Sequence, residues 1–383
     1  MNGTIVVAGA IARQAGRAGH TWQYLQYLLG FRQLGYDVLY VEHLDDQHCV
    51  DAAWQPAPFA ESANVAVFKA VCDRFKLNGA AALLQSAGDG WCGMSRADVR
   101  AWAAASDLFV NLSGRFHLRD ILDAAPRRAY VDLDPGFTQI WQAGYGADMN
   151  LPGHDVYLTV GMNVGAPDCP VPTLGLDWHG IFPPVVRQRW SPLAEIGDAY
   201  TTVADWRGYA PIEWNGQWYK QKADEFLSII ELPQHVDKPL EICLAIDPSE
   251  PDLPRLLANG WRLSDPNVHA ATPDSYRNYV RRSRGEFSVA KHGYVVGRTG
   301  WMSDRTVCYL AAGRPAIVQD TGLWQHLELG DGLLVFDYID RAERALREVE
   351  RNYRHHCRAA AELAERYFDS DRVLSELLDI AGV

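Results

Sequence analysis

Residues 4–41 read TIVVAGAIARQAGRAGHTWQYLQYLLGFRQLGYDVLYV, and this stretch predicts the fold. It opens with a β-branched run at Thr4 to Ala8 and continues through a loop that contains three glycines. Helical spacing then runs from Trp22 to Leu34, and Gly35 stands where a left-handed residue commonly ends a helix. A second apolar strand follows at Asp37 to Val41. A strand, a helix and a second strand in this order form the βαβ unit of a parallel sheet.

The same alternation continues along the chain. Further strands are expected at Asp107–Leu112, Ala129–Leu133, Asp155–Val160, Ala199–Ala204, Leu240–Ile246, Gly293–Val296 and Ala316–Val318. Helices are expected at Trp218–Leu232, from Asp340 onward and at Val373–Ile380. Because 383 residues exceed what one hydrophobic core usually serves, we expect two domains. The predicted fold class is α/β, with two Rossmann-like, doubly wound parallel-sheet domains that face a cleft.

A proline- and tryptophan-rich stretch from Pro167 to Pro192 lacks a clear period and is interpreted as the connection between the domains. The expected boundaries are residues 1–180 for the N-terminal domain and 195–355 for the C-terminal domain. Residues 356–383 are expected to form C-terminal helices that could cross back to the N-terminal domain.

Composition narrows the function classes. With 48 acidic and 36 basic side chains the net charge is −12, which disfavours a nucleic-acid partner. The seven cysteines are scattered without CxxC spacing, so we expect a reduced, cytoplasmic protein. No apolar run approaches the roughly 18 residues that a membrane helix needs, and a transmembrane segment is not expected.

The first candidate site is the loop Gly16-Arg17-Ala18-Gly19-His20. Backbone N–H groups at a helix start can hold an anion, and Gly16 and Gly19 allow close approach. The imidazole of His20 could accept a proton at neutral pH, because its ordinary pKa is near 6.5. The alternative is that the two glycines only permit a tight turn and that His20 is a surface residue.

The second candidate site lies within residues 288–334, SVAKHGYVVGRTGWMSDRTVCYLAAGRPAIVQDTGLWQHLELGDGLL. Ser303, Asp304 and Arg305 open a helix there, and either of the first two could cap it. Free N–H groups at such a helix start, together with Arg305, would oppose a negatively charged ligand. After the next strand, the turn formed by Gln319, Asp320, Thr321 and Gly322 stands at the sheet edge where α/β proteins bind ligands. The alternative is an ordinary turn between a strand and a helix.

Both stretches resemble glycosyltransferases of the GT-B type. The first matches their N-terminal Gly-His loop, and the second matches their donor-binding half, with spore-maturation-type and family 1-like bacterial enzymes nearest. The resemblance implies a nucleotide-diphosphate sugar as donor, a small-molecule or glycan acceptor held by residues 1–180, and no cofactor. It implies that His20 is the catalytic base, with Asp134 as a candidate partner that orients it. No metal is required if Arg305 and the helix N-terminus hold the leaving diphosphate.

Further phosphate-binding candidates are Arg207, Lys291 and Arg298, for which solvated surface charge is the alternative. Retaining GT-B enzymes carry two glutamates at places held here by Gly300 and Cys308, so an inverting reaction is favoured. A nucleotide-sugar epimerase and a non-catalytic sugar-nucleotide-binding protein of the same fold remain alternatives. An acidic pair at Asp132 and Asp134 resembles a metal motif, but it is interpreted as turn structure or acceptor-cleft lining.

Overall fold

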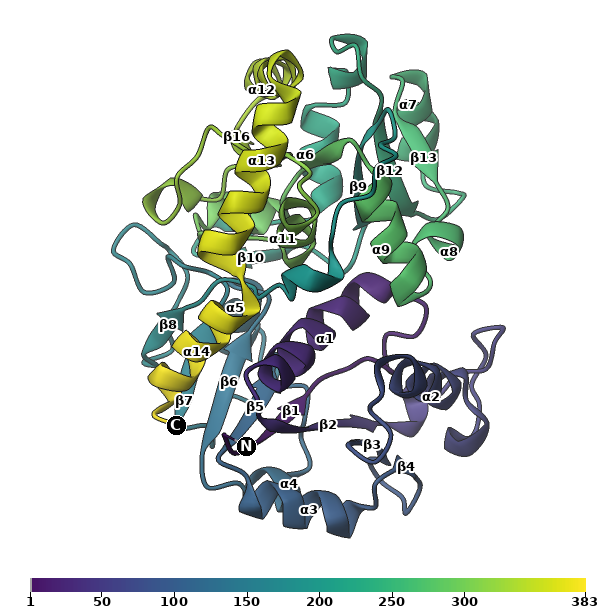
Figure 1. Cartoon of the computed structure of the whole chain (residues 1–383), viewed down its shortest axis with the longest axis vertical. Coiled ribbons are helices and arrows are strands. Elements are labelled where there is room, and N and C mark those ends of the chain that lie inside the picture. Colours follow the sequence, from purple (N-terminus) through teal and green to yellow (C-terminus); the bar gives the residue numbers. More distant parts are fainter. Residues whose placement is uncertain (1) are drawn as a thin grey trace.

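The computed structural model describes residues 2–383 and contains two parallel sheets, one above the other in Figure 1. The N-terminal half is built on an eight-stranded sheet in the order β4-β3-β2-β1-β5-β6-β7-β8. Its strands are β1 (Thr4–Ala8), β2 (Asp37–Leu44), β3 (Ala81–Gln85), β4 (Trp91–Gly93), β5 (Leu108–Leu112), β6 (Arg128–Asp132), β7 (Val156–Thr159) and β8 (Trp178–Gly180). Neighbouring strands are parallel except β3 and β4, which pair antiparallel at one edge.

The helices of this half are α1 (Ala18–Gln33), α2 (Ala63–Phe75), α3 (Arg96–Ala105), α4 (Arg119–Leu122) and α5 (Phe137–Gly144). Short 3-10 turns are η1 (Asp46–His48), η2 (Phe59–Glu61) and η3 (Arg187–Arg189). The two central strands are almost wholly buried, which explains why they read as continuous apolar runs rather than as alternating patterns.

The C-terminal half is built on a six-stranded, fully parallel sheet in the order β13-β12-β9-β14-β15-β16. Its strands are β9 (Tyr200–Asp205), β12 (Leu240–Ala245), β13 (Arg262–Ser264), β14 (Gly285–Ser288), β15 (Ala316–Gln319) and β16 (Leu333–Phe336). A separate antiparallel hairpin is formed by β10 (Ile212–Trp214) and β11 (Gln217–Tyr219).

The helices of this half are α6 (Lys222–Ser228), α7 (Asp252–Ala258), α8 (Pro266–His269), α9 (Pro273–Arg282), α10 (His292–Val296), α11 (Asp304–Ala311), α12 (Ile339–Arg351) and α13 (Tyr353–Leu363). Short 3-10 turns are η4 (Leu232–Gln234) and η5 (Leu323–Gln325). A π-helical turn, η6 (Ala364–Phe368), leads into the last helix, α14 (Ser370–Ala381). In Figure 1 these last helices, in yellow, descend from the upper half to the lower half. Gly30 of α1 allows this approach, because an added Cβ would lie 2.4 Å from Leu374 of α14.

Helix α1 also packs against the C-terminal half. Trp22 of α1 belongs to the same buried cluster as Tyr276 of α9 and Tyr309 of α11. An added Cβ on Gly19 would lie 3.3 Å from the Tyr276 ring, so the glycine permits this close packing. The two sheets therefore share one hydrophobic core through α1.

The predicted α/β fold with two Rossmann-like parallel sheets is confirmed. Two element predictions are wrong. Gly293–Val296 lies within helix α10, and the strand of that region is β14, whose sequence GEFS offers little apolar signal. Residues 218–232 begin in β11, and their helix α6 spans only Lys222–Ser228. Within residues 2–383, no helix is long and apolar enough to cross a membrane.

Candidate functional site

The carboxyl ends of the strands in both sheets meet between the two halves. Residues that follow β1 and β6 contact residues that end β9 or follow β14. Arg17 forms an ion pair with Asp205, and the Lys291 amine lies 2.9 Å from the Asp134 carboxylate. Ligands of open parallel sheets bind at such edges, so this junction is the candidate site.

A small hollow of about 10 Å³, room for about one water molecule, lies at the carboxyl ends of β14 and β15 beside the start of α11 and is open in part to solvent. Its lining residues are Ser288, Val289, Ala290, Trp301, Met302, Ser303, Arg305, Thr306, Val318, Gln319 and Leu323. Ser303 is the N-cap of α11, and its hydroxyl accepts a hydrogen bond from the Arg305 backbone N–H at 3.2 Å. Asp304 is the first residue of the helix rather than its cap, and burial raises the pKa of its carboxyl. The hollow thus begins at the positive end of a capped helix.

The guanidinium of Arg305, which was predicted to oppose the donor's charge, is bound to other groups of the protein. Its guanidinium donates to Glu286 at 2.6 Å, to the Ser288 hydroxyl at 2.6 Å and to the Val203 carbonyl at 3.1 Å. Glu286 has no exposed surface, so the pair is buried and its charges neutralise each other. Arg305 therefore forms the floor of the hollow, and its donors already have partners.

Lys222, at the start of α6, supplies the cation that sequence reasoning missed. It is half-buried, and its amine forms no hydrogen bond or ion pair with residues 2–383. Burial, together with the nearby charges of Arg305 and Lys291, lowers the pKa of Lys222 to about 7. A lysine held this way gains from an incoming anion. No local motif distinguishes it from the other lysines of the sequence.

The predicted sugar-binding turn is largely occupied by its own hydrogen bonds. The Gln319 amide donates to Glu225 and accepts from the Ala290 N–H at 3.1 Å. Asp320 accepts from the Gly322 N–H at 2.8 Å, and the Thr321 hydroxyl donates to the Trp301 carbonyl at 2.8 Å. Gly322 has a φ of +93°, which the turn requires. Gln319 still lines the hollow, whereas the other three residues shape the turn beside it.

His20 lies in the first turn of α1 and is exposed. Atoms of both halves crowd its ring, and this partial loss of water lowers the pKa of His20 to about 4. Asp205 opposes the shift, while Arg17 and Arg115 add to it. The imidazole is consequently neutral at pH 7 and can accept a proton.

Asp134 does not orient His20, contrary to the expectation. It accepts hydrogen bonds from Lys291 at 2.9 Å, from the Tyr209 hydroxyl at 2.9 Å and from the Tyr294 hydroxyl at 2.5 Å. The Lys291 amine also lies 4.5 Å from the centre of the Tyr209 ring, a cation–π distance. Lys291 is thus committed to Asp134 rather than free for a phosphate.

The remaining candidates lie elsewhere. Arg207 is paired with Glu250 and Asp252, at 3.2 and 2.8 Å, and Arg298 lies 3.5 Å from Asp168. Both arginines are about half exposed and are bound to carboxylates of the protein. Gly16 has a φ of +76° in the loop before α1. Gly19 is inside the helix and serves packing rather than the loop.

The acidic pair has no metal-binding arrangement. Asp132 is fully buried and accepts from Thr138, Gln139 and Thr159 at 2.7 to 2.9 Å. Across the part of the chain that the structure describes, no group of three His, Cys, Asp or Glu side chains could hold a metal ion. The interpretation of Asp132 as turn structure agrees with these bonds.

Comparisons with known proteins agree with this architecture. No protein-family profile and no curated protein sequence matches the chain. Among solved structures it is similar to the alpha-glucosyltransferase AGT in complex with UDP, with a TM-score of 0.59 and 11% identity over 99% of both chains. It is similar to AviGT4, a glycosyltransferase involved in avilamycin A biosynthesis, with a TM-score of 0.56 and 12% identity over 99% of this chain and 97% of that one.

A third similar structure is HepE of Anabaena in complex with UDP and glucose, with a TM-score of 0.52 and 12% identity over 99% of this chain and 100% of that one. These likenesses span the whole chain at low identity, so they establish the fold. The chain has the GT-B glycosyltransferase fold. The particular resemblance to spore-maturation-type enzymes stays a prediction.

Proposed function

We propose that the protein is a glycosyltransferase that moves a sugar from a nucleotide-diphosphate sugar to an acceptor held by the N-terminal half. The observation that carries the proposal is Lys222, an unpaired cation with a pKa near 7 beside the buried Arg305 and the capped start of α11. The start of a capped helix together with an unpaired amine suits a diphosphate, whose oxygens need N–H donors and positive charge.

UDP is the nucleotide that we favour for the donor. Two structures with the same fold, AGT and HepE, were solved with UDP. In our proposal Lys222 and the free N–H groups of α11 hold the diphosphate, and Trp301 lines the hollow as a surface for a ring. No metal is needed in this arrangement, because these donors stabilise the negative charge of the leaving group.

The proposed chemistry is a single displacement with inversion. His20 takes the proton of the acceptor hydroxyl while that oxygen bonds to the anomeric carbon of the sugar. The bond from the anomeric carbon to the diphosphate oxygen breaks, and its electron pair leaves on the nucleotide diphosphate. Gly300 and Cys308 hold the places of the two glutamates of retaining enzymes. The Cys308 thiol is buried and lies 3.5 Å from the Gln26 amide, so it packs against α1.

Three alpha-glucosyltransferase structures of the same fold hold a 13-mer DNA, but we do not propose DNA as the acceptor of this chain. A net charge of −12 opposes a polymeric phosphate backbone. We therefore propose a small-molecule or glycan acceptor.

Calorimetric titration with UDP tests the donor site, in buffer with EDTA to test metal independence. We compare the wild type with Lys222→Ala and with Lys69→Ala, which removes an exposed lysine of α2 in the other half. Loss of one charge-assisted contact to the diphosphate should weaken binding about tenfold or more in Lys222→Ala and leave Lys69→Ala unchanged. Equal UDP affinity in all three proteins would refute the assignment of Lys222.

Turnover is tested separately by UDP release from UDP-sugars with a panel of acceptors. Release that depends on an acceptor and is lost in His20→Ala supports a transferase. UDP binding without acceptor-dependent release would instead indicate an epimerase or a binding protein of the same fold.

A further inference from the structure

A group of basic side chains that the proposed chemistry does not use lies at the carboxyl edge of the N-terminal sheet. Its members come from the loop after β1, the end of β2, the turn η1 and the loop after β5. They are Arg13, His43, His48, Arg115 and His117, which we call the basic cluster. Arg13 Nη2 lies 3.0 Å from His48 Nε2, and the ring centres of His43 and His117 are 5.3 Å apart.

The cluster is short of negative charge. Burial lowers the pKa of Arg13, and the neighbouring Arg115 lowers it further. Burial also lowers the pKa of His43, to about 4, and the His117 ring adds to this shift. Two carboxylates face the cluster: Asp45, whose Oδ2 lies 3.4 Å from His48 Nδ1, and Asp148, whose charge opposes the lowering of the His117 pKa.

A further acidic side chain nearby, Glu42, is fully buried and already accepts hydrogen bonds from other groups of the protein. Its carboxylate accepts from the backbone N–H groups of Ala12 and Arg13, both at 2.8 Å, and from the Tyr40 hydroxyl at 2.9 Å. Burial raises the pKa of Glu42 to about 7. Its hydrogen bonds therefore hold the loop after β1 in place.

Two ring nitrogens of the cluster, Nδ1 of His43 and Nδ1 of His48, form no hydrogen bond with the described residues. His43 is only 6% exposed, and its Nδ1 has no hydrogen-bond partner among residues 2–383. Buried polar atoms in folded proteins are nearly always paired with protein, water or ligand. The Arg115 side chain, which is exposed, also forms no hydrogen bond or ion pair within the described residues.

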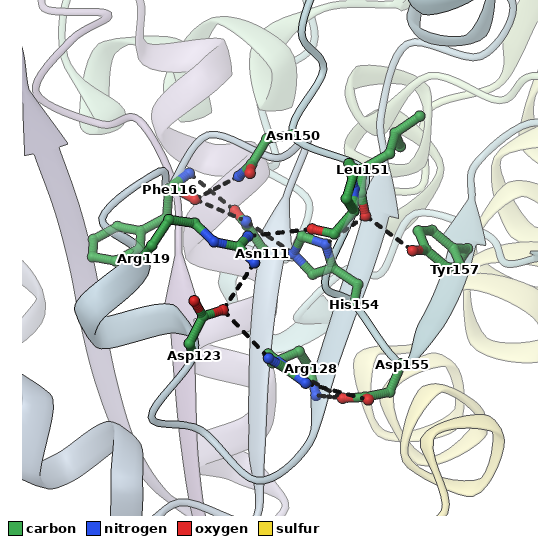
Figure 2. A network of polar contacts seen from close by, with 11 residues as sticks. Asn111, Phe116, Arg119, Asp123, Arg128, Asn150, Leu151, His154, Asp155 and Tyr157 are labelled. Carbon is green, nitrogen blue, oxygen red and sulfur yellow. Dashed lines mark hydrogen bonds and ion pairs between the residues drawn. The ribbon is translucent and has the colours of Figure 1, made fainter.

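The loop that carries Arg115 and His117 is held in place by the polar network of Figure 2. The Asn111 side chain accepts from the Phe116 N–H at 3.0 Å and donates to the Phe116 carbonyl at 3.1 Å. Asn150 donates to the Phe116 carbonyl at 2.7 Å and to the Gly114 carbonyl at 3.2 Å. His154 in turn lies 3.1 Å from the Asn111 amide nitrogen.

This loop requires backbone conformations with positive φ. Gly114 has a φ of +60°, and an added Cβ would lie 2.5 Å from the Met149 carbonyl oxygen. The preceding residue, Ser113, also has a positive φ of 54°. Two buried asparagines thus hold a strained loop whose outward residues are Arg115 and His117, as expected of a preorganised binding loop.

The charge of the basic cluster also acts on the candidate base. Arg115 is one of the charges that lower the pKa of His20, as well as that of Arg13 and His48. An anionic group bound at Arg115 would therefore lie on the same side of the junction as His20, across from the hollow of the C-terminal half.

We propose that the basic cluster binds an oxyanion of the acceptor, a phosphate or a carboxylate, and so presents the acceptor's hydroxyl to His20. The inference rests on the proposed transferase function and adds the chemical class of the acceptor. Arg115 donates its N–H groups to the oxyanion, and the buried His43 donates through its unpaired nitrogen. The overall charge of −12 restricts the ligand to a small acceptor rather than a polyanion.

NMR of the histidine side chains tests the assignment. The protein is saturated with UDP and titrated at constant ionic strength with inorganic phosphate or, in parallel, with acetate. Binding should shift the ring resonances of His43 and His117 and raise the pKa values of both rings, because a bound anion favours the imidazolium. Response to phosphate alone or to acetate alone identifies which oxyanion the acceptor carries.

Arg115→Ala should weaken this binding about tenfold, and Arg115→Lys should retain part of it. Arg344→Ala, an exposed arginine of α12, is the control and should have no effect. The variants should fold, because Arg115 is exposed and forms no side-chain bond within residues 2–383. Circular dichroism checks that they do.

Three results would overturn the inference: neither anion shifts the His43 and His117 resonances, Arg115→Ala binds as well as the wild type, or saturation with UDP abolishes the response. The last result would place the anion in the donor hollow. Failure of the proposed function looks different, because UDP would then not bind, or would bind without acceptor-dependent release, while the anions still shift His43 and His117.

Discussion

Lys291 of the C-terminal half and Asp134 of the N-terminal half form an ion pair at 2.9 Å within a shell of aromatic rings. Both side chains are mostly buried, at 19% and 25% exposed. The pair joins the carboxyl edge of β6 to that of β14, the two edges between which a donor and an acceptor would meet. Its geometry makes it an interdomain contact rather than a catalytic pair.

Asp134→Ala should therefore lower the free energy of unfolding. The change leaves the Lys291 amine and two tyrosine hydroxyls without their common acceptor, which should cost about 2–3 kcal/mol. Urea denaturation measures the loss. The matched control is Asp120→Ala, which breaks an exposed pair with Arg96 at 2.7 Å and should cost less than about 1 kcal/mol. Similar losses in the two variants would show that the interdomain pair adds no special stability.

Lys222 predicts how UDP binding depends on pH. Its pKa of about 7 in the free protein means that the ammonium form, which binds a diphosphate, becomes scarce as the pH rises above 7. A bound diphosphate raises that pKa again, so UDP affinity should be greatest below pH 7 and should fall up to about tenfold per pH unit above it.

Lys222→Arg is the control for this titration. A guanidinium stays charged throughout the range, so the variant should show no such fall between pH 7 and pH 9. If the wild type and Lys222→Arg had parallel pH profiles of the UDP dissociation constant, the fall would belong to another group.

The depressed pKa of His20 predicts the pH dependence of turnover. A base with its ordinary pKa would lose activity below about pH 6.5. His20 titrates near 4, so kcat/KM should stay level from pH 7 down to about pH 5 and decline only as the pH approaches 4. The stability linkage has the same sign, because a pKa lowered in the folded state stabilises the protein above pH 6.5 and loses that contribution as the pH falls toward 4.

His20→Ala should lower kcat by about 100-fold or more, the usual contribution of a positioned base. Kinetics with saturating donor and acceptor measure the loss, and UDP affinity should be unchanged in the variant. An acid limb at pH 6.5, or a variant with normal kcat, would exclude His20 as the base.

The sequence was most informative where parallel strands are buried on both faces. Strand β1 at Thr4–Ala8 was predicted with its observed bounds, because its apolar run is uninterrupted. Strand β14 was missed because its central Glu286 is charged, and only the fold shows that Arg305 neutralises it. A partner 19 residues away on another element leaves no local pattern.

In the candidate site, too, some residues could be predicted from the sequence and others could not. The glycine loop and the helix after it pointed to His20, but the sequence placed His20 in the loop, whereas α1 already begins at Ala18. The role of Lys222 could not be predicted, because its importance depends on Arg305 and Lys291 reaching the same place from α11 and the end of β14. Asp134 was wrongly assigned to His20 since nearness at a sheet edge does not say which neighbour a carboxylate will bind.

The last prediction concerns the buried Glu286–Arg305 pair. It distinguishes two roles of Arg305: stabilising the structure around the hollow and binding the donor. Arg305→Met would leave the Glu286 carboxylate, with no exposed surface, without its cation, and should cost about 3–5 kcal/mol in the free energy of unfolding. Adding Glu286→Gln removes the stranded charge and should restore part of that stability. Chemical denaturation of the single and double variants measures both effects.

UDP titration of the folded double variant then decides what Arg305 does. Because the guanidinium is bound to Glu286, Ser288 and a backbone carbonyl, its loss should change UDP affinity by less than about threefold, whereas Lys222→Ala should change it about tenfold. A larger loss of UDP affinity in the double variant than in Lys222→Ala would mean that Arg305 turns from Glu286 to the diphosphate when UDP binds. The Glu286–Arg305 ion pair would then exist only in the protein without UDP.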